Sequence, residues 1–118
     1  MSKKLILVLV LVVFFFGFNS ARAEVVINEV AWMGTATSQY EEWIELKNIG
    51  SESVSLSGWK LYKSGGTVLF SLSKTIPANG YFLVCRTTPS VANPLSGTCD
   101  EQGVFGGGGL SNTSDLVQ

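Results

Sequence analysis

Three carboxylates gather around a tryptophan in the stretch YEEWIELKN, residues 40–48. Glu41, Glu42 and Glu45 are of the residue type that serves as general acid, general base or metal ligand. A glycosidase-type pair needs two carboxyl groups that face each other across a substrate, roughly 5 to 9.5 Å apart. Whether these side chains can converge depends on the element that carries them.

The stretch that carries the carboxylates alternates apolar and polar residues, which is typical of a half-buried β-strand. We expect this strand to span residues 41–48. Neighbouring side chains of a strand point to opposite faces, and Ile44 and Leu46 must face the core. The core face is then expected to hold Glu42, Ile44, Leu46 and Asn48. The outer face is expected to hold Glu41, Trp43, Glu45 and Lys47.

This alternation separates the three carboxylates and argues against a catalytic pair within the strand. Glu45 could still meet a carboxylate on a neighbouring strand, such as Glu29, so an enzyme that uses these two residues stays open as an alternative. A solvated row in which Glu45 lies beside Lys47 and Trp43 explains the same residues without any reaction. We therefore expect no catalytic residues.

Composition excludes other common catalytic and ligand sets. The chain contains no histidine, so it cannot pair a serine or cysteine nucleophile with a histidine base, and its two cysteines alone make no zinc site. The glycine run at 106–109 is followed by Leu110 rather than by the lysine of a phosphate-binding loop. Asp100 and Glu101 match no calcium loop. We expect neither a metal nor a cofactor.

The N-terminal segment has the composition of an export signal. Lys3 and Lys4 precede an apolar run of 14 residues, 5–18, which is interrupted by one glycine. As a helix this run would extend only about 21 Å at about 1.5 Å per residue. A bilayer core is roughly 30 Å thick, so the run is short for a membrane span and suits the core of a signal peptide.

A cleavage site follows this apolar run. Ala21 and Ala23 supply small residues at the −3 and −1 positions that a signal peptidase requires. We expect a signal peptide over residues 1–23 and a mature domain over residues 24–118, located outside the cell, on its surface or in the periplasm. An uncleaved membrane anchor is the alternative.

Removal of the signal peptide changes the net charge. Lys3, Lys4 and Arg22 are three of the eight basic residues, and the segment has no acid, so the mature part keeps five basic residues against nine acidic ones, a net charge of −4. Nucleic acids and anionic membranes attract basic proteins. We expect no nucleic-acid partner, and membrane contact only through an uncleaved signal.

The two cysteines, Cys85 and Cys99, both lie in the mature part. Export places them in an oxidising compartment, where an even number of cysteines usually pairs. We therefore expect a Cys85–Cys99 disulfide. Closing a loop of about 15 residues contributes up to about 3 kcal/mol, which matters for a domain of this modest size.

The rest of the mature part alternates apolar and polar residues at a period of two, and Gly, Asn, Ser and Pro punctuate it at short intervals. This pattern is typical of an all-β sandwich or barrel. In the first strand, Val26 and Val30 are expected on one face. The expected strands cover residues 25–32, 41–48, 54–56, 59–62, 67–72 and 81–85, of which the last is expected to be central. A long loop is expected over residues 86–103.

Residues 115–118 have the pattern of a strand that is only beginning. An unpaired last strand on a secreted protein is an aggregation hazard. We therefore expect the chain to be a fragment of a longer protein.

Aromatic residues supply the remaining binding signal. Rings with one polar atom often serve at interfaces, and a planar pair of exposed aromatics on one sheet face would indicate sugar binding. Three tryptophans in a small sandwich are nevertheless expected mainly as core residues. The candidates are Trp32, Tyr40, Trp43, Trp59 and Tyr62.

Four motifs follow one another along the mature part: INEV at 27–30, WIELKN at 43–48, LSGWKL at 56–61 and PANGYFLV at 77–84. In this order they resemble the lamin-tail domain, an immunoglobulin-like module named for nuclear lamins and found also in exported bacterial and archaeal proteins. The resemblance covers the whole mature part and implies a compact β-sandwich with no catalytic residues. It implies a structural role for Asn28, Glu29, Trp43, Glu45, Gly58 and Trp59.

These features predict a secreted, non-catalytic interaction module that serves as an adhesion or targeting unit of a larger extracellular protein. Its partner would be a protein or a cell-surface glycan. A carbohydrate-binding module is the alternative, because uncharged glycans do not demand a basic surface. DNA binding by analogy with the nuclear relatives conflicts with the export signal and with the acidic charge.

Overall fold

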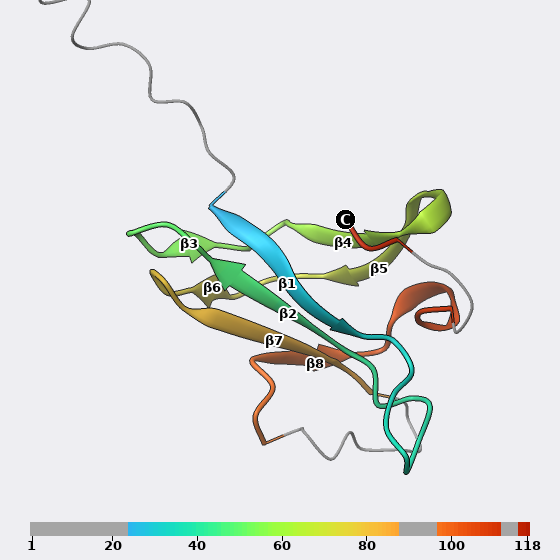
Figure 1. Cartoon of the computed structure of the whole chain (residues 1–118). Coiled ribbons are helices and arrows are strands. Elements are labelled where there is room, and N and C mark those ends of the chain that lie inside the picture. Colours follow the sequence, from blue (N-terminus) through green and yellow to red (C-terminus); the bar gives the residue numbers. More distant parts are fainter. Residues whose placement is uncertain (1–23, 88–96, 112–115) are drawn as a thin grey trace, which may run out of the picture.

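The computed structural model describes residues 24–87, 97–111 and 116–118. The expected signal peptide, with Ala21 and Ala23 at its cleavage site, lies outside the described residues. The described part is all-β, as the alternation predicts, and it has the layered arrangement of an immunoglobulin-like sandwich (Figure 1).

One layer of the sandwich is a four-stranded sheet in the order β1-β2-β7-β8. The strands β1 (Val25–Ala31), β2 (Trp43–Asn48) and β7 (Tyr81–Arg86) pair antiparallel, and β8 (Glu101–Gly103) pairs parallel to β7. The nearly continuous apolar strand β7 thus lies inside the sheet, which confirms its predicted central position.

The second layer consists of two short strand pairs. In one, β3 (Val54–Ser55) pairs with β6 (Thr75–Ile76); in the other, β4 (Lys60–Lys63) pairs with β5 (Thr67–Ser71). A tight turn, η1 (Ser64–Gly66), joins β4 to β5, and Gly65 and Gly66 have φ angles of 82° and 78°. Glycine populates this region without steric cost, so the predicted hairpin turn is confirmed.

The core lies between the two layers. Ile44 and Leu46 of β2 are fully or almost fully buried, which confirms the face that the alternation assigns to them. The same packing buries aliphatic side chains of the opposite layer and one phenylalanine that follows β8. The buried core comprises Ile44, Leu46, Leu56, Leu61, Leu69, Leu72, Ile76, Phe82, Val84, Phe105 and Leu110.

The prediction for the faces of β1 is wrong because the strand contains a β-bulge. Ile27 lies opposite Leu46 and Glu29 lies opposite Glu45, so Asn28 is an extra residue in the ladder. One extra residue reverses the alternation beyond it. Val30 therefore packs against the core together with Val25 and Ile27, whereas Val26 is exposed.

Glu41 does not join the outer row of β2, which is a second correction. The strand begins at Trp43 rather than at residue 41, so strand alternation does not govern Glu41 and Glu42. Both are buried, and the hydroxyl of Thr35 donates a hydrogen bond to the Glu41 carboxylate.

The segment 86–103 is not one long loop. Arg86 is the last residue of β7, and β8 begins at Glu101. The disulfide between Cys85 and Cys99 is present, with its Cα atoms 5.9 Å apart, as the cysteine count predicts. It ties β7 to the residues just before β8. A short 3₁₀ turn, η2 (Gly106–Gly108), then leads the chain under β5 (Figure 1).

Candidate functional site

The structure brings together Glu29 and Glu45, the one carboxylate pair that the sequence left open. The two residues lie opposite each other on β1 and β2. The side-chain amide of Asn28 donates a hydrogen bond to Glu45 Oε1 at 2.6 Å. All three belong to the motif positions, and the bulge is what places the Asn28 amide on Glu45. They stand on the outer face of the sheet and line neither of the two hollows described below.

Other motif residues share this outer face. Trp43 is half-buried and lies opposite Cys85, whereas Tyr81 lies opposite Lys47. The Lys47 ammonium sits 3.7 Å from the centroid of the Tyr81 ring and donates to the Asn79 carbonyl at 2.6 Å. One face of the exposed Tyr81 ring is therefore occupied by a cation. Trp43 and Tyr81 do not form an open planar pair for a sugar.

All three tryptophans lie outside the buried core, contrary to the prediction. Trp32 directly follows β1 and is 39 % exposed, and Trp59 directly precedes β4 and is 45 % exposed. Trp59 follows Gly58, whose φ of 83° belongs to the turn in which the Trp59 N–H donates to the Leu56 carbonyl. Because this turn ends just before the strand, Trp59 stands at the rim of the sandwich.

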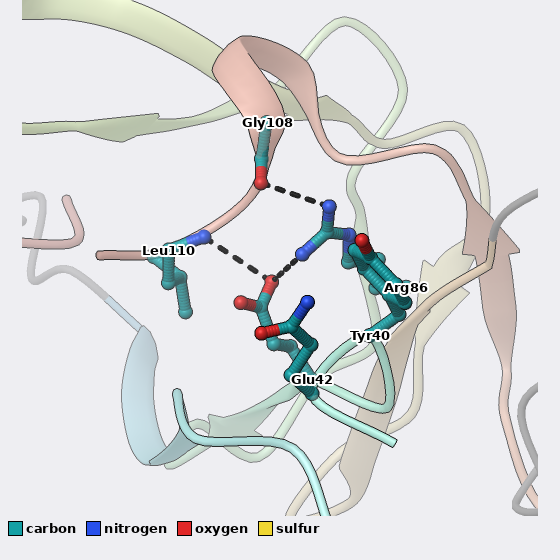
Figure 2. Close-up of a pocket in the computed structure, with 6 residues that line it drawn as sticks. Tyr40, Glu42, Arg86, Gly108 and Leu110 are labelled. Carbon is teal, nitrogen blue, oxygen red and sulfur yellow. Dashed lines mark hydrogen bonds and ion pairs between the residues drawn. The ribbon is translucent and has the colours of Figure 1, made fainter. Parts of the chain in front are cut away.

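A small polar pocket lies where the chain passes from residue 39 into β2. It has a volume of about 160 Å³, and a buried ion pair forms its floor (Figure 2). Arg86 Nη1 lies 3.0 Å from Glu42 Oε2, and these side chains are only 9 % and 2 % exposed. The polar pocket is lined by Gln39, Tyr40, Glu42, Arg86, Gly108 and Leu110.

Further hydrogen bonds join the ion pair to the glycine-rich segment 106–110, which comprises η2 and the two residues after it. Arg86 Nη2 donates to the Gly108 carbonyl at 2.8 Å, and the Leu110 N–H donates to Glu42 Oε2 at 3.2 Å (Figure 2). The guanidinium carbon of Arg86 lies 5.0 Å from the centroid of the Tyr40 ring. Burial raises the pKa of Glu42, and the Leu110 N–H and Arg86 oppose that rise.

This arrangement holds three segments together: the residue before β2, the end of β7 and residues 108–110. The Glu42 carboxylate is already bonded to Arg86 and Leu110. The described residues that line the polar pocket include no second acid. Lys63 at the end of β4 also binds the glycine-rich segment. Its ammonium donates to the carbonyls of Gly107 and Gly109 at 2.9 and 2.7 Å. We assign the polar pocket a structural role. The sequence prediction missed the pair because it placed Arg86 in a loop.

The second hollow is an apolar groove between β1 and β4. It has a volume of about 360 Å³, within the range of about 300 to 1,000 Å³ typical of ligand sites. Among the described residues that line it, Lys60 is the only one with a charged side chain. The apolar groove is lined by Val25, Val26, Ile27, Leu46, Trp59, Lys60, Leu61, Leu72 and Gln118.

The acidic residues near the disulfide serve as hydrogen-bond acceptors. Asp100 Oδ2 accepts the Leu83 N–H at 2.7 Å, and the Glu101 carboxylate accepts the Ser73 N–H at 3.0 Å. These bonds anchor the start of β8 to β7 and to the chain after β5. Among the described residues, no group of three His, Cys, Asp or Glu side chains is placed to hold a metal ion.

The described segments contain no helix that is long and apolar enough to cross a membrane. None of the curated proteins compared with this chain matches it.

A family model described as Lamin Tail Domain matches residues 19–116, beginning slightly before the expected first mature residue, Glu24. The match spans most of the chain and agrees with the two-layered β fold and with the order of the four sequence motifs. The chain therefore belongs to the lamin tail domain family, a family of immunoglobulin-like domains rather than of enzymes.

Proposed function

We propose that this protein is a secreted, non-catalytic interaction module, an adhesion or targeting unit of a larger extracellular protein, and that it binds its partner at the apolar groove. The observation that carries this proposal is the exposed Trp59 at the rim of that groove. Membership of a family of immunoglobulin-like domains supports the non-catalytic part, and the disulfide supports export.

Trp59 has the properties of a residue that anchors a partner. Tryptophan is enriched among the residues that contribute most to binding, because a large rigid ring buries much apolar area with few rotatable bonds. Here nearly half of the residue's surface is exposed in the free protein, beside the aliphatic side chains of Leu61 and Leu72. A partner that covers the groove would therefore bury the ring together with a continuous apolar floor.

Binding of a carbohydrate is the second candidate, because the exposed Trp59 ring could stack on a sugar. The lining of the apolar groove favours a protein partner instead. Sugar hydroxyls lose their hydrogen bonds to water on binding and need polar partners in the site. Of the lining residues that the structure describes, Lys60 and Gln118 alone bring polar side chains to the groove.

The proposal is tested by measuring binding of the exported protein to washed cells of its source organism. The protein is collected after export from the full gene, labelled with a fluorophore and titrated onto the cells in a flow cytometer. We expect saturable binding. We expect Trp59→Ala to weaken it about thirtyfold, the effect of losing a central aromatic contact.

Tyr81→Ala is the matched control, since Tyr81 is also exposed but lies on the outer face of the four-stranded sheet, outside the lining of the groove. This variant should bind like the wild type. The proposal is refuted if binding is absent or never saturates, or if Trp59→Ala and Tyr81→Ala bind equally well. Competition by a soluble polysaccharide at low concentration would move the function to carbohydrate recognition.

A further inference from the structure

The turn between β6 and β7 contains Asn79 and Gly80, the only asparagine in the sequence that is followed by a glycine. The Gly80 N–H donates to the Pro77 carbonyl at 3.0 Å, which closes a β-turn over residues 77–80. Asn79 is exposed and has a φ of 54°. An asparagine beside an unhindered main-chain nitrogen is chemically labile, because that nitrogen can attack the side-chain amide.

The geometry of this turn requires both residues. Asparagine is one of the few residues besides glycine that readily adopts a positive φ. A Cβ atom at position 80 would lie 2.6 Å from Pro77 Cγ and 2.9 Å from the Pro77 carbonyl oxygen, so only glycine fits there. The labile pair is therefore a consequence of how the turn is built.

Lys47 lies where a cation makes the peptide group between Asn79 and Gly80 more reactive. Its ammonium donates to the Asn79 carbonyl at 2.6 Å. This carbonyl and the Gly80 N–H belong to one planar, conjugated peptide group. A cation on the oxygen stabilises the negative charge that the group acquires when its nitrogen loses the proton. The deprotonated nitrogen is the nucleophile, so Lys47 favours the attack.

The hydrogen bond from Gly80 to Pro77 opposes the attack, since the N–H must leave the Pro77 carbonyl before the nitrogen can react. Pro77 and Asn79 are exposed, and an exposed turn opens more readily than the strands that it joins. The contact from Lys47 comes from a long side chain on β2, which can follow the carbonyl as the turn opens. Lys47 therefore acts on the open turn as well.

We propose that Asn79 is a site of spontaneous deamidation and that Lys47 promotes the reaction. The Gly80 nitrogen bonds to the side-chain carbonyl carbon of Asn79, the bond from that carbon to Nδ2 breaks, and ammonia leaves with the proton of the Gly80 nitrogen. Water then opens the cyclic imide. Addition of water at the side-chain carbonyl gives aspartate, and addition at the main-chain carbonyl gives isoaspartate.

The isoaspartate product changes the turn in two ways. The main-chain carbonyl that Lys47 binds becomes a free carboxylate, so the hydrogen bond becomes an ion pair. The main chain also gains one carbon between two hydrogen bonds that hold the turn, from the Asn79 N–H to the Gly50 carbonyl and from the Asn48 N–H to the Gly80 carbonyl. We expect this form to unfold at a lower temperature than the unmodified protein.

The test is to incubate the exported protein for several weeks at neutral pH, below its melting temperature. Peptide mapping by mass spectrometry measures the conversion of each asparagine. Asn28 is the internal reference, since it is also exposed but is followed by Glu29. We expect Asn79 to convert at least about tenfold faster than Asn28, because glycine has no side chain to hinder closure of the ring.

Variants of Lys47 test its role. Lys47→Met should slow the conversion of Asn79 about fivefold, and Lys47→Arg, which keeps the charge, should restore most of the rate. Base-catalysed hydrogen exchange of the Gly80 amide passes through the same deprotonated nitrogen, so NMR should show it slowed by a similar factor in Lys47→Met. About 1 M salt should slow the wild type toward the rate of Lys47→Met, because salt screens an exposed cation.

Each part of the proposal has an outcome that would overturn it. If Asn79 converts no faster than Asn28, it is not a site of deamidation. Faster conversion or faster Gly80 exchange in Lys47→Met would show that Lys47 only keeps the turn closed. If circular dichroism shows that Lys47→Met is unfolded, the wild type still decides, since a rate that does not fall with salt would contradict a promoting charge.

Discussion

Replacing Arg86 by methionine is the sharpest test of how this small sandwich is held together. Methionine keeps most of the aliphatic length of arginine but removes the charge. Glu42 then stays buried, with the Leu110 N–H as its remaining short-range partner among those described. The hydrogen bond from Arg86 to the Gly108 carbonyl is lost at the same time, which removes a link between the glycine-rich segment and β7.

The expected loss is large because one member of a buried ion pair is left behind. Removing one partner of such a pair costs about 3 to 5 kcal/mol, since the other charge stays out of water without compensation. A domain of this size has a free energy of unfolding of about 5 to 15 kcal/mol. We therefore expect Arg86→Met to lower the free energy of unfolding at neutral pH by about 3 kcal/mol or more, and the melting temperature by about 12 °C or more.

The loss should depend on pH, because Glu42 can escape its penalty by taking up a proton. Burial raises its pKa above the ordinary 4.5, and Arg86 opposes this rise. A carboxyl group whose pKa is raised by folding stabilises the fold most below 4.5, and this contribution is lost as the pH rises through the folded pKa. Without Arg86 the pKa rises further. The difference between variant and wild type should therefore be smallest near about pH 4 and should widen toward about pH 7.

The assay is urea unfolding followed by tryptophan fluorescence at several pH values, with Lys47→Met as the control. Lys47 is also a cation over an aromatic ring, but it lies on the outer face, where we expect a loss of at most about 1 kcal/mol. The double variant Glu42→Gln with Arg86→Met should recover much of the lost stability. A loss below about 1 kcal/mol for Arg86→Met, or a loss that does not change with pH, would refute the reasoning.

Three further predictions concern other parts of the chain. Reduction of the Cys85–Cys99 disulfide, whose cysteines are 14 residues apart, should lower the free energy of unfolding by about 3 kcal/mol in urea titrations; two free thiols in the denatured, unreduced protein would contradict the bond. Gly109→Ala should cost about 2 kcal/mol or more, because a Cβ atom there would collide with the Arg86 and Glu42 side chains and φ is +88°. Gly108→Ala should cost only about 1 kcal/mol in the same titration, since its Cβ would meet nothing within 4 Å. Mass spectrometry of the exported protein should show a mature chain that begins at Glu24; a chain that retains residues 1–23 would support the uncleaved anchor.

Much of the fold could be predicted because it follows from local alternation and turn chemistry. Ile44 and Leu46 are buried as expected, since residues two positions apart in a regular strand share one face. The hairpin at Gly65 and Gly66 follows from the positive φ that this turn demands. The same local rule fails at Asn28, because a bulge depends on how β1 pairs with β2 and not on the sequence of β1 alone.

The candidate sites were harder to predict, because each is built from segments far apart in the chain. Glu42 looked like a member of a carboxylate cluster and Arg86 like a loop residue, yet the fold joins them 3.0 Å apart under the glycine-rich segment. Trp59 was expected in the core, and its position after the Gly58 turn leaves it at the rim of the apolar groove instead.

The sequence by itself determined the class of the fold, the central position of β7 and the pairing of the two cysteines. The fold class and the position of β7 follow from the pattern of apolar and polar residues along each strand. The disulfide follows from the presence of two cysteines, and both features can be read from the covalent chain. Only the tertiary structure decided which charge neutralises Glu42 and where the bulge falls. Those features depend on the relative placement of residues that are distant in sequence, and packing between the two layers sets that placement.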